Sequence, residues 1–134
     1  MNQDTIDKVS LIHIKEKKIL VTLSKGKDTW YQPGGKREKG ETDIQTLIRE
    51  LKEELSVVII PSTIKFYGTF RAQAHGKPEG VIVQMKCYTA EFNGEPSPSQ
   101  EIERFDYFPY SRKMETSAVD HLIFDDLKEK GLIE

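Results

Sequence analysis

Residues 42–55 constrain the fold of this chain more than any other stretch, because they have the pattern of an amphipathic helix. Apolar residues recur there every three or four positions, at Ile44, Leu47, Ile48, Leu51 and Leu55. Thr42 and Gln45 have the spacing of a capping box, which predicts that the helix begins just after Thr42. The apolar face of this helix has to pack against the rest of the chain.

The same helix carries an acidic face beside its apolar face. With successive residues turned by roughly 100°, Glu50, Glu53 and Glu54 fall within an arc of roughly 100°. Like charges at this spacing destabilise a helix by roughly 0.2–0.5 kcal/mol per pair, and a bound cation would reverse that penalty. Oxygen ligands alone favour a hard ion such as Mg²⁺ or Mn²⁺. The alternative is a solvated helix face, neutralised by Arg49 and Lys52.

Short runs of β-branched and aromatic residues predict strands around this helix. Two apolar runs, 11–14 and 19–23, flank a charged tip and predict a hairpin. Further strands are expected at 30–31, 57–60, 64–72, 81–92 and 105–108, and a second helix at about 116–130. Strands interleaved with two helices indicate an α/β (α+β) fold, in which a mixed β-sheet lies between the helices.

Composition limits what the chain can do. Its 134 residues are the length of a single domain, 1–134, which can bury a core without disulfides. The net charge of -2 argues against general binding to nucleic acid. Cys87 is the only cysteine, and no stretch has the pattern of a membrane span or a signal peptide. We therefore expect a cytoplasmic protein that does not bind membranes.

The spacing of residues between Gly35 and Val57 closely resembles the Nudix box, G-x5-E-x7-R-E-U-x-E-E-x-G-U, in which U is aliphatic. The matching residues are Gly35, Glu41, Arg49, Glu50, Leu51, Glu53, Glu54 and Val57. Eight of the nine specified positions match, and the remaining position carries Ser56 in place of Gly. The chain thus resembles a MutT-like Nudix hydrolase, and the expected fold is a Nudix-like α/β/α sandwich.

This resemblance implies that the chain hydrolyses a pyrophosphate linkage in a nucleoside diphosphate attached to another group, such as a nucleoside triphosphate. It also implies a divalent metal cofactor, Mg²⁺ or Mn²⁺. Glu53 and Glu54 would bind the metal, with help from Glu50 and the carbonyl oxygen of Gly35. Glu41 would support the metal site from the loop before the helix.

The resemblance also assigns a catalytic carboxylate to Glu50, with Arg49 as the residue that orients it. A carboxylate held beside a metal can take a proton from the attacking water. In the family the base is sometimes on the box and sometimes on a later loop. Glu101, at the end of the loop 93–100, is therefore the alternative base, although an ordinary loop-end glutamate fits that position equally well.

Contacts to the substrate are less clearly encoded. Lys36, Arg37 and Lys39 cluster at the entry of the box, where they could meet phosphates, and solubilising surface charges are the alternative. The expected partner is a small-molecule nucleotide, and homo-oligomers are left open. A second hypothesis gives the chain the same fold but a non-catalytic, nucleotide-sensing role.

Ser56 replaces the glycine of the box at a position where the backbone conformation of the helix end matters. Glycine commonly ends a helix in the left-handed conformation, which costs a residue with a side chain ~1–2 kcal/mol. The sequence therefore predicts either a strained Ser56 or a shifted helix end.

Overall fold

Two α-helices and nine strands make up the part of the chain that the computed structural model describes, residues 5–134. The strands are β1 (Thr5–Ile12), β2 (Ile14–Lys15), β3 (Lys18–Ser24), β4 (Gly34–Lys36), β5 (Val58–Ile59), β6 (Lys65–Gln73), β7 (Ile82–Thr89), β8 (Phe92–Asn93) and β9 (Ile102–Phe108). The helices are α1 (Asp43–Leu55) and α2 (Ala118–Glu129), and short 3₁₀ helices cover Pro61–Thr63 and Tyr110–Glu115.

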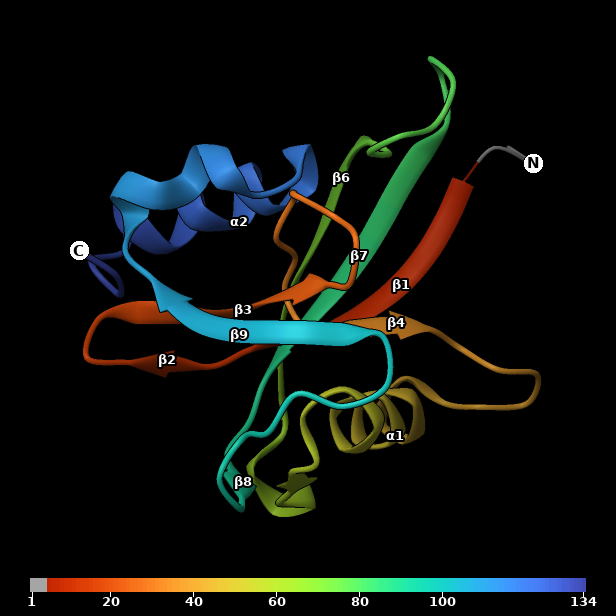
Figure 1. The fold of residues 1–134 in the computed structure, drawn as a ribbon, viewed down its shortest axis with the longest axis vertical. Helices are drawn as coiled ribbons and strands as arrows, with labels where there is room; N and C mark the ends of the chain where they lie inside the picture. The colour runs from red at the N-terminus through yellow and green to blue at the C-terminus, as the bar shows by residue number, and fades with distance from the viewer. Residues whose placement is uncertain (1–4) are drawn as a thin grey trace.

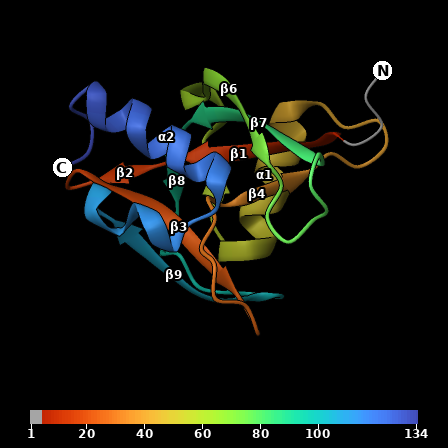
Figure 2. The same ribbon diagram turned by 90° about the horizontal axis from the view of Figure 1, so that it is seen from above.

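The strands form a layer between the two α-helices, so the α/β/α arrangement expected from the sequence is confirmed (Figures 1 and 2). The largest sheet has the order β4-β1-β7-β6. It is mixed, because β1 is parallel to β7 while β4 and β6 are antiparallel to their neighbours. A second sheet has the order β2-β3-β9, and β5 pairs with β8. No helix in residues 5–134 is long and apolar enough to cross a membrane.

The expected hairpin forms only at its tip. Strand β2 pairs with β3 as expected, but the preceding residues belong to β1, which enters the large sheet beside β7. The chain changes sheet at His13, whose carbonyl oxygen accepts a hydrogen bond from Leu20 N at 2.9 Å. Leu11 and Ile12 point to opposite faces and both are buried, which is typical of a strand inside a parallel pair. A hairpin exposed on one face could not bury both.

The remaining elements follow the sequence expectations with three differences. The expected strand 81–92 is interrupted after Thr89, and its last residues form β8, which pairs with β5. The aromatic segment 105–108 extends back to Ile102 as β9. Residues 30–31 contribute only isolated bridges, Thr22 with Tyr31 and Trp30 with Thr116.

Helix α1 packs on one side of the strands through Leu47, Leu51 and Leu55, all fully buried. Ile48 is partly buried against the same cluster. Ile44 is 45% exposed, so its expected place in the packing face is wrong. It lies in the first turn of the helix, next to the cap, and is not part of this cluster.

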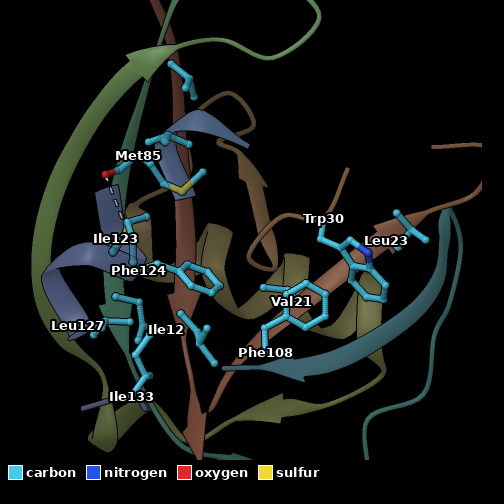
Figure 3. Close-up of a cluster of buried hydrophobic side chains, with 14 of the residues drawn as sticks. Ile12, Val21, Leu23, Trp30, Met85, Phe108, Ile123, Phe124, Leu127 and Ile133 are labelled. Carbon is cyan, nitrogen blue, oxygen red and sulfur yellow. Dashed lines mark hydrogen bonds between the residues drawn. The ribbon is translucent and has the colours of Figure 1, made fainter. Parts of the chain in front are cut away.

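A separate apolar core lies under α2 on the other side of the strands (Figure 3). Phe124 and Leu127 of α2 are fully buried there. Trp30 and Phe108 extend the cluster toward β3 and β9, with their ring centroids 4.9 Å apart. The large sheet is thus covered on both faces.

Candidate active site

Two adjacent glycines bring β4 close to both β1 and α1. Gly34 pairs with Ser10 of β1 at φ +147°, and a Cβ at Gly34 would overlap the carbonyl oxygen of Val9. A Cβ at Gly35 would overlap the carboxylate of Glu50. Glycine at these two positions therefore allows the backbone of β4 to touch a strand on one side and an acidic side chain on the other.

Helix α1 begins with the capping box that its sequence predicts. The hydroxyl of Thr42 accepts a hydrogen bond from Gln45 N at 3.2 Å, and the Gln45 side-chain oxygen accepts one from Thr42 N at 2.9 Å. Both donors would otherwise lack partners at the start of the helix. The cap fixes the helix start, and with it the direction in which the acidic side chains project.

The end of the helix is held by Ser56 and by the loop before β9. Ser56 has left-handed backbone angles, φ 57° and ψ 34°, and its N–H donates to the carbonyl oxygen of Lys52. Ser97 N donates to Leu55 O at 2.8 Å, and Ser99 N donates to Glu54 O at 2.9 Å. These bonds tie the loop 94–100 to the helix end and place the following residue, Glu101, beside the acidic face.

Arg49 is the centre of a network that orders the acidic side chains. Its guanidinium donates to both oxygens of Glu41, at 2.7 and 2.9 Å, and to the carbonyl oxygen of Lys36 at 3.1 Å. It also donates to Glu50 at 3.3 Å and to Glu53 at 3.2 Å. The expected contact between Arg49 and Glu50 is therefore present, and its catalytic role stays a prediction.

Glu41 serves this network from the loop before the helix. Besides Arg49, its carboxylate accepts hydrogen bonds from the Thr46 hydroxyl at 2.9 Å and from Glu38 N at 2.8 Å. The bond to Arg49 does most to lower the pKa of Glu41, to about 2. A charged Glu41 that faces Arg49 supports the site indirectly, and direct metal binding by Glu41 stays a prediction.

Burial acts on two carboxylates of α1, those of Glu50 and Glu54. Burial raises the pKa of Glu50, against the opposing effect of Arg49. Glu54 is 6% exposed, and burial together with the neighbouring Glu50 raises its pKa well above the usual value. Gly34 N donates to Glu54 at 3.2 Å. Two acids held close together away from water favour a nearby positive charge.

A cleft of about 680 Å³ connects these groups to solvent. Gly35, Lys36, Glu50, Glu54 and Glu101 all line it, so the structure brings these expected site residues together. The expected site residues Arg37, Lys39 and Glu53 are not part of its lining. Arg37 is instead held in ion pairs by Asp7 and Asp43, Lys39 is exposed, and Glu53 is bonded to Arg49. Their expected contacts with substrate or metal stay predictions.

The oxygen atoms in the cleft are the kind of ligand that a hard divalent cation prefers. The cleft lining offers the carboxylate oxygens of Glu50 and Glu54 and the backbone of Gly35, and the like charges of the two acids disfavour their ionised forms. Within residues 5–134, no group of three or more acidic, His or Cys side chains is already arranged as a metal site.

The cleft also contains residues that sequence reasoning missed. Lys8 and Gln32 line it, from β1 and from the segment before β4. Asp120, fully buried at the start of α2, accepts hydrogen bonds from Gln32 N at 3.4 Å and from the Ser117 hydroxyl at 2.5 Å. Lys8 precedes the first apolar run of the sequence, and nothing in the sequence distinguished Lys8, Gln32 or Asp120.

Comparison with known proteins gives a family match and several structural matches. The family model for the NUDIX domain matches residues 5–123. A protein from Chromobacterium violaceum assigned to the nudix hydrolase family is 25% identical, with a TM-score of 0.67, over 96% of this chain and 80% of that one. No curated protein matches the chain.

Two further solved structures share the fold at lower identity. A MutT NUDIX hydrolase from Burkholderia pseudomallei is 18% identical, with a TM-score of 0.75, over 90% of this chain and 96% of that one. The ORF135 protein of E. coli is 21% identical, with a TM-score of 0.71, over 94% of this chain and 92% of that one. The shared architecture therefore extends over nearly the whole of each chain.

Proposed function

The chain belongs to the NUDIX domain family and is a hydrolase of anhydride bonds, and from this premise we propose that it cleaves the pyrophosphate linkage of a nucleotide. The substrate is a nucleoside diphosphate linked to another group, such as a third phosphate. The observation that carries this proposal is the pair Glu50 and Glu54, held in the wall of one cleft with Arg49 beside them. A cleft of about 680 Å³ has the volume of a small-molecule site.

We propose Mg²⁺ as the cofactor, with Mn²⁺ as a substitute. Glu50 and Glu54 would hold it, together with Glu53 and the carbonyl oxygen of Gly35. When bound, a divalent ion spreads the negative charge of the phosphate oxygens in the transition state. The raised pKa values of Glu50 and Glu54 support this assignment, because a nearby cation would stabilise their ionised forms.

Glu50 is our candidate for the group that accepts the proton of the attacking water. Its carboxylate lines the cleft beside Gly35, where a water next to the metal would lie within its reach. Arg49 holds the carboxylate against Gly35, and it is in turn fixed by Glu41. Glu101 lines the same cleft and is the alternative base.

Of the three basic residues expected to bind substrate, Lys36 lines the cleft. We therefore propose that Lys36 contacts a substrate phosphate. A non-catalytic, nucleotide-sensing role is not favoured, because a protein that only binds has no need for a proton-accepting carboxylate. The single-domain organisation over 1–134 and the cytoplasmic location stay predictions.

The proposal is tested by product analysis with a panel of nucleoside triphosphates, nucleotide sugars and dinucleotides, each with Mg²⁺, with Mn²⁺ and with EDTA. We expect metal-dependent release of a nucleoside monophosphate from at least one class. Glu50→Gln should abolish most of this release, while the exposed control Glu129→Gln on α2 should keep it. Release that is independent of metal, or no release from any nucleotide, would contradict the proposal.

A further inference from the structure

The cleft continues beyond the acidic residues to a second group of side chains with a different chemistry. Lys8, Tyr31, His75 and Met85 line both the main cleft and an adjoining hollow of about 70 Å³. Tyr31 and His75 face each other edge to face, with ring centroids 6.1 Å apart. This recess, defined by Lys8, Tyr31, Gln32, His75 and Met85, offers flat and apolar surfaces that the acidic end of the cleft lacks.

Gln32 is the first sign that the recess receives a polar ligand. Its side chain is in the cleft lining and only 4% exposed, yet neither its amide nitrogen nor its amide oxygen has a hydrogen-bond partner among residues 5–134. A buried polar group without a partner is costly, and native proteins rarely keep one without a reason. The backbone N–H of Gln32 donates a hydrogen bond to Asp120, so this segment is anchored to the start of α2.

Lys8 is the second sign. Its ammonium lies 5.7 Å from the centre of the Tyr31 ring, and it forms no ion pair within the described part of the chain. Lys8 lines the adjoining hollow as well as the main cleft, and it presents hydrogen-bond donors only.

We propose that the recess binds the base of the nucleotide substrate, that Gln32 bonds to the edge of the base, and that Lys8 selects bases with a lactam edge, such as guanine, hypoxanthine and uracil. This inference rests on the proposed function, since it names the substrate class of the same cleft. A lactam presents a carbonyl oxygen beside an N–H. The carbonyl oxygen can accept from both Lys8 and the Gln32 amide nitrogen, and the N–H can donate to the Gln32 amide oxygen.

Adenine and cytosine have an exocyclic amine at the position where the lactam bases have the carbonyl oxygen. The amine donates hydrogen bonds and would meet the donors of Lys8, which leaves both groups unsatisfied. The ring of Tyr31 and the thioether of Met85 give the base apolar contacts in either case. Discrimination therefore depends on Lys8. The Gln32 amide, which can turn to match either kind of edge, and the aromatic and sulfur contacts supply general affinity.

The test compares kcat/KM for GTP, ITP and UTP with kcat/KM for ATP and CTP, at one Mg²⁺ concentration. We expect the wild type to favour the lactam bases by about 10–100-fold, the range that a hydrogen bond to a charged group provides. Lys8→Met should reduce this preference, whereas Gln32→Leu should lower kcat/KM for all five triphosphates. The matched control is Lys86→Met, since Lys86 lies on β7 next to Met85 and does not line the cleft.

A second measurement does not require turnover. Binding of GMP, IMP and UMP is compared with binding of AMP and CMP by calorimetry, without metal, for the wild type and the same variants. Gln32→Leu should fold with unchanged or raised stability, because no hydrogen bond is lost within the described residues. Gln32→Leu should weaken every monophosphate, which tests the recess as the site of the base even if Lys8→Met does not fold.

The outcomes separate this inference from the proposed function. Equal turnover of all five triphosphates overturns the inference and leaves the hydrolase proposal intact. If no nucleotide of the panel is cleaved, the proposed function fails and the monophosphate binding ratios alone decide the inference. If Lys8→Met weakens all nucleotides equally, Lys8 contacts phosphate, and base selection by Lys8 is wrong.

Discussion

Glu50 has the most constrained position of any acidic side chain in the cleft. Its carboxylate lies against the Cα of Gly35 on one side and accepts a hydrogen bond from Arg49 on the other. Arg49 is itself fixed by Glu41 and by the Lys36 carbonyl oxygen. At the scale of single residues, the catalytic assignments can be tested by substitutions that leave these contacts of Arg49 in place.

The first prediction separates the two candidate bases. Glu50→Gln keeps the size of the side chain but removes its ability to accept a proton, so kcat should fall by about 10²–10⁴-fold. Glu101→Gln should change kcat little, because Glu101 is exposed at the end of its loop. Steady-state kinetics on the best substrate of the panel measures both. The opposite order of effects would move the base to Glu101.

The second prediction concerns Gly35. A methyl group there would displace the Glu50 carboxylate, so Gly35→Ala should lower kcat by about 10²-fold, which is typical of a small misplacement. Stability should change by no more than about 1 kcal/mol, since the displaced atoms are the end of a flexible side chain. Gly68→Ala is the control, because a Cβ there meets only Phe70 at 3.5 Å. Equal activity in both variants would contradict the packing of Glu50 on Gly35.

The third prediction uses the pH dependence of stability. Burial raises the pKa of Asp120 to about 6, while the unfolded chain has the ordinary value near 3.8. The folded chain therefore binds this proton more tightly, so the contribution is fully present below about pH 4 and lost as pH rises through about 6. The difference in unfolding free energy between the wild type and Asp120→Asn should fall by about 3 kcal/mol from about pH 4 to about pH 7. Parallel urea-unfolding profiles for the two proteins would contradict it.

At the scale of elements, sequence reasoning succeeded where a local pattern decides the structure. The period of Leu47, Leu51 and Leu55, with the capping box at Thr42, was enough to predict α1 and its buried face. It failed for the hairpin, because the partner of β1 is β7, which lies far along the chain. Alternating apolar residues predict a strand, but they do not name the strand beside it.

The end of α1 gives the fourth prediction. Ser56 is held at φ 57°, which is strained for a residue with a side chain and not for glycine. Ser56→Gly should raise the free energy of unfolding by about 1 kcal/mol, measured by urea unfolding. Turnover should not change, because Ser56 does not line the cleft. A destabilised variant would mean that Ser56 makes a compensating interaction at the helix end.

At the scale of the whole molecule, the cleft exists because distant segments meet. Lys8 comes from β1, Gln32 precedes β4, Glu54 lies on α1 and Glu101 follows a long loop. The spacing within α1 could predict that Glu50 and Glu54 share a face. It could not predict which other side chains complete the cleft, because those positions depend on the order of strands in the sheet.

Stabilisation by metal tests this assembly as a whole. A ligand that binds only the folded chain stabilises it by about 2.7 kcal/mol when present at about a hundred times its Kd. For a chain of this length the melting temperature should rise by about 10 °C with saturating Mg²⁺ and return to its starting value with EDTA. Mn²⁺ should act in the same direction.

The shift should depend on the acidic face of α1. Glu54→Gln should lose most of it, because Glu54 is in the cleft wall beside Glu50 and Gly34. Glu53→Gln should lose part of it, because Glu53 has to turn from Arg49 to reach the ion. Glu129→Gln, an exposed acid on α2, should keep the full shift. Differential scanning calorimetry of the four proteins with and without Mg²⁺ measures this order, and equal shifts in all four would show that the ion binds elsewhere.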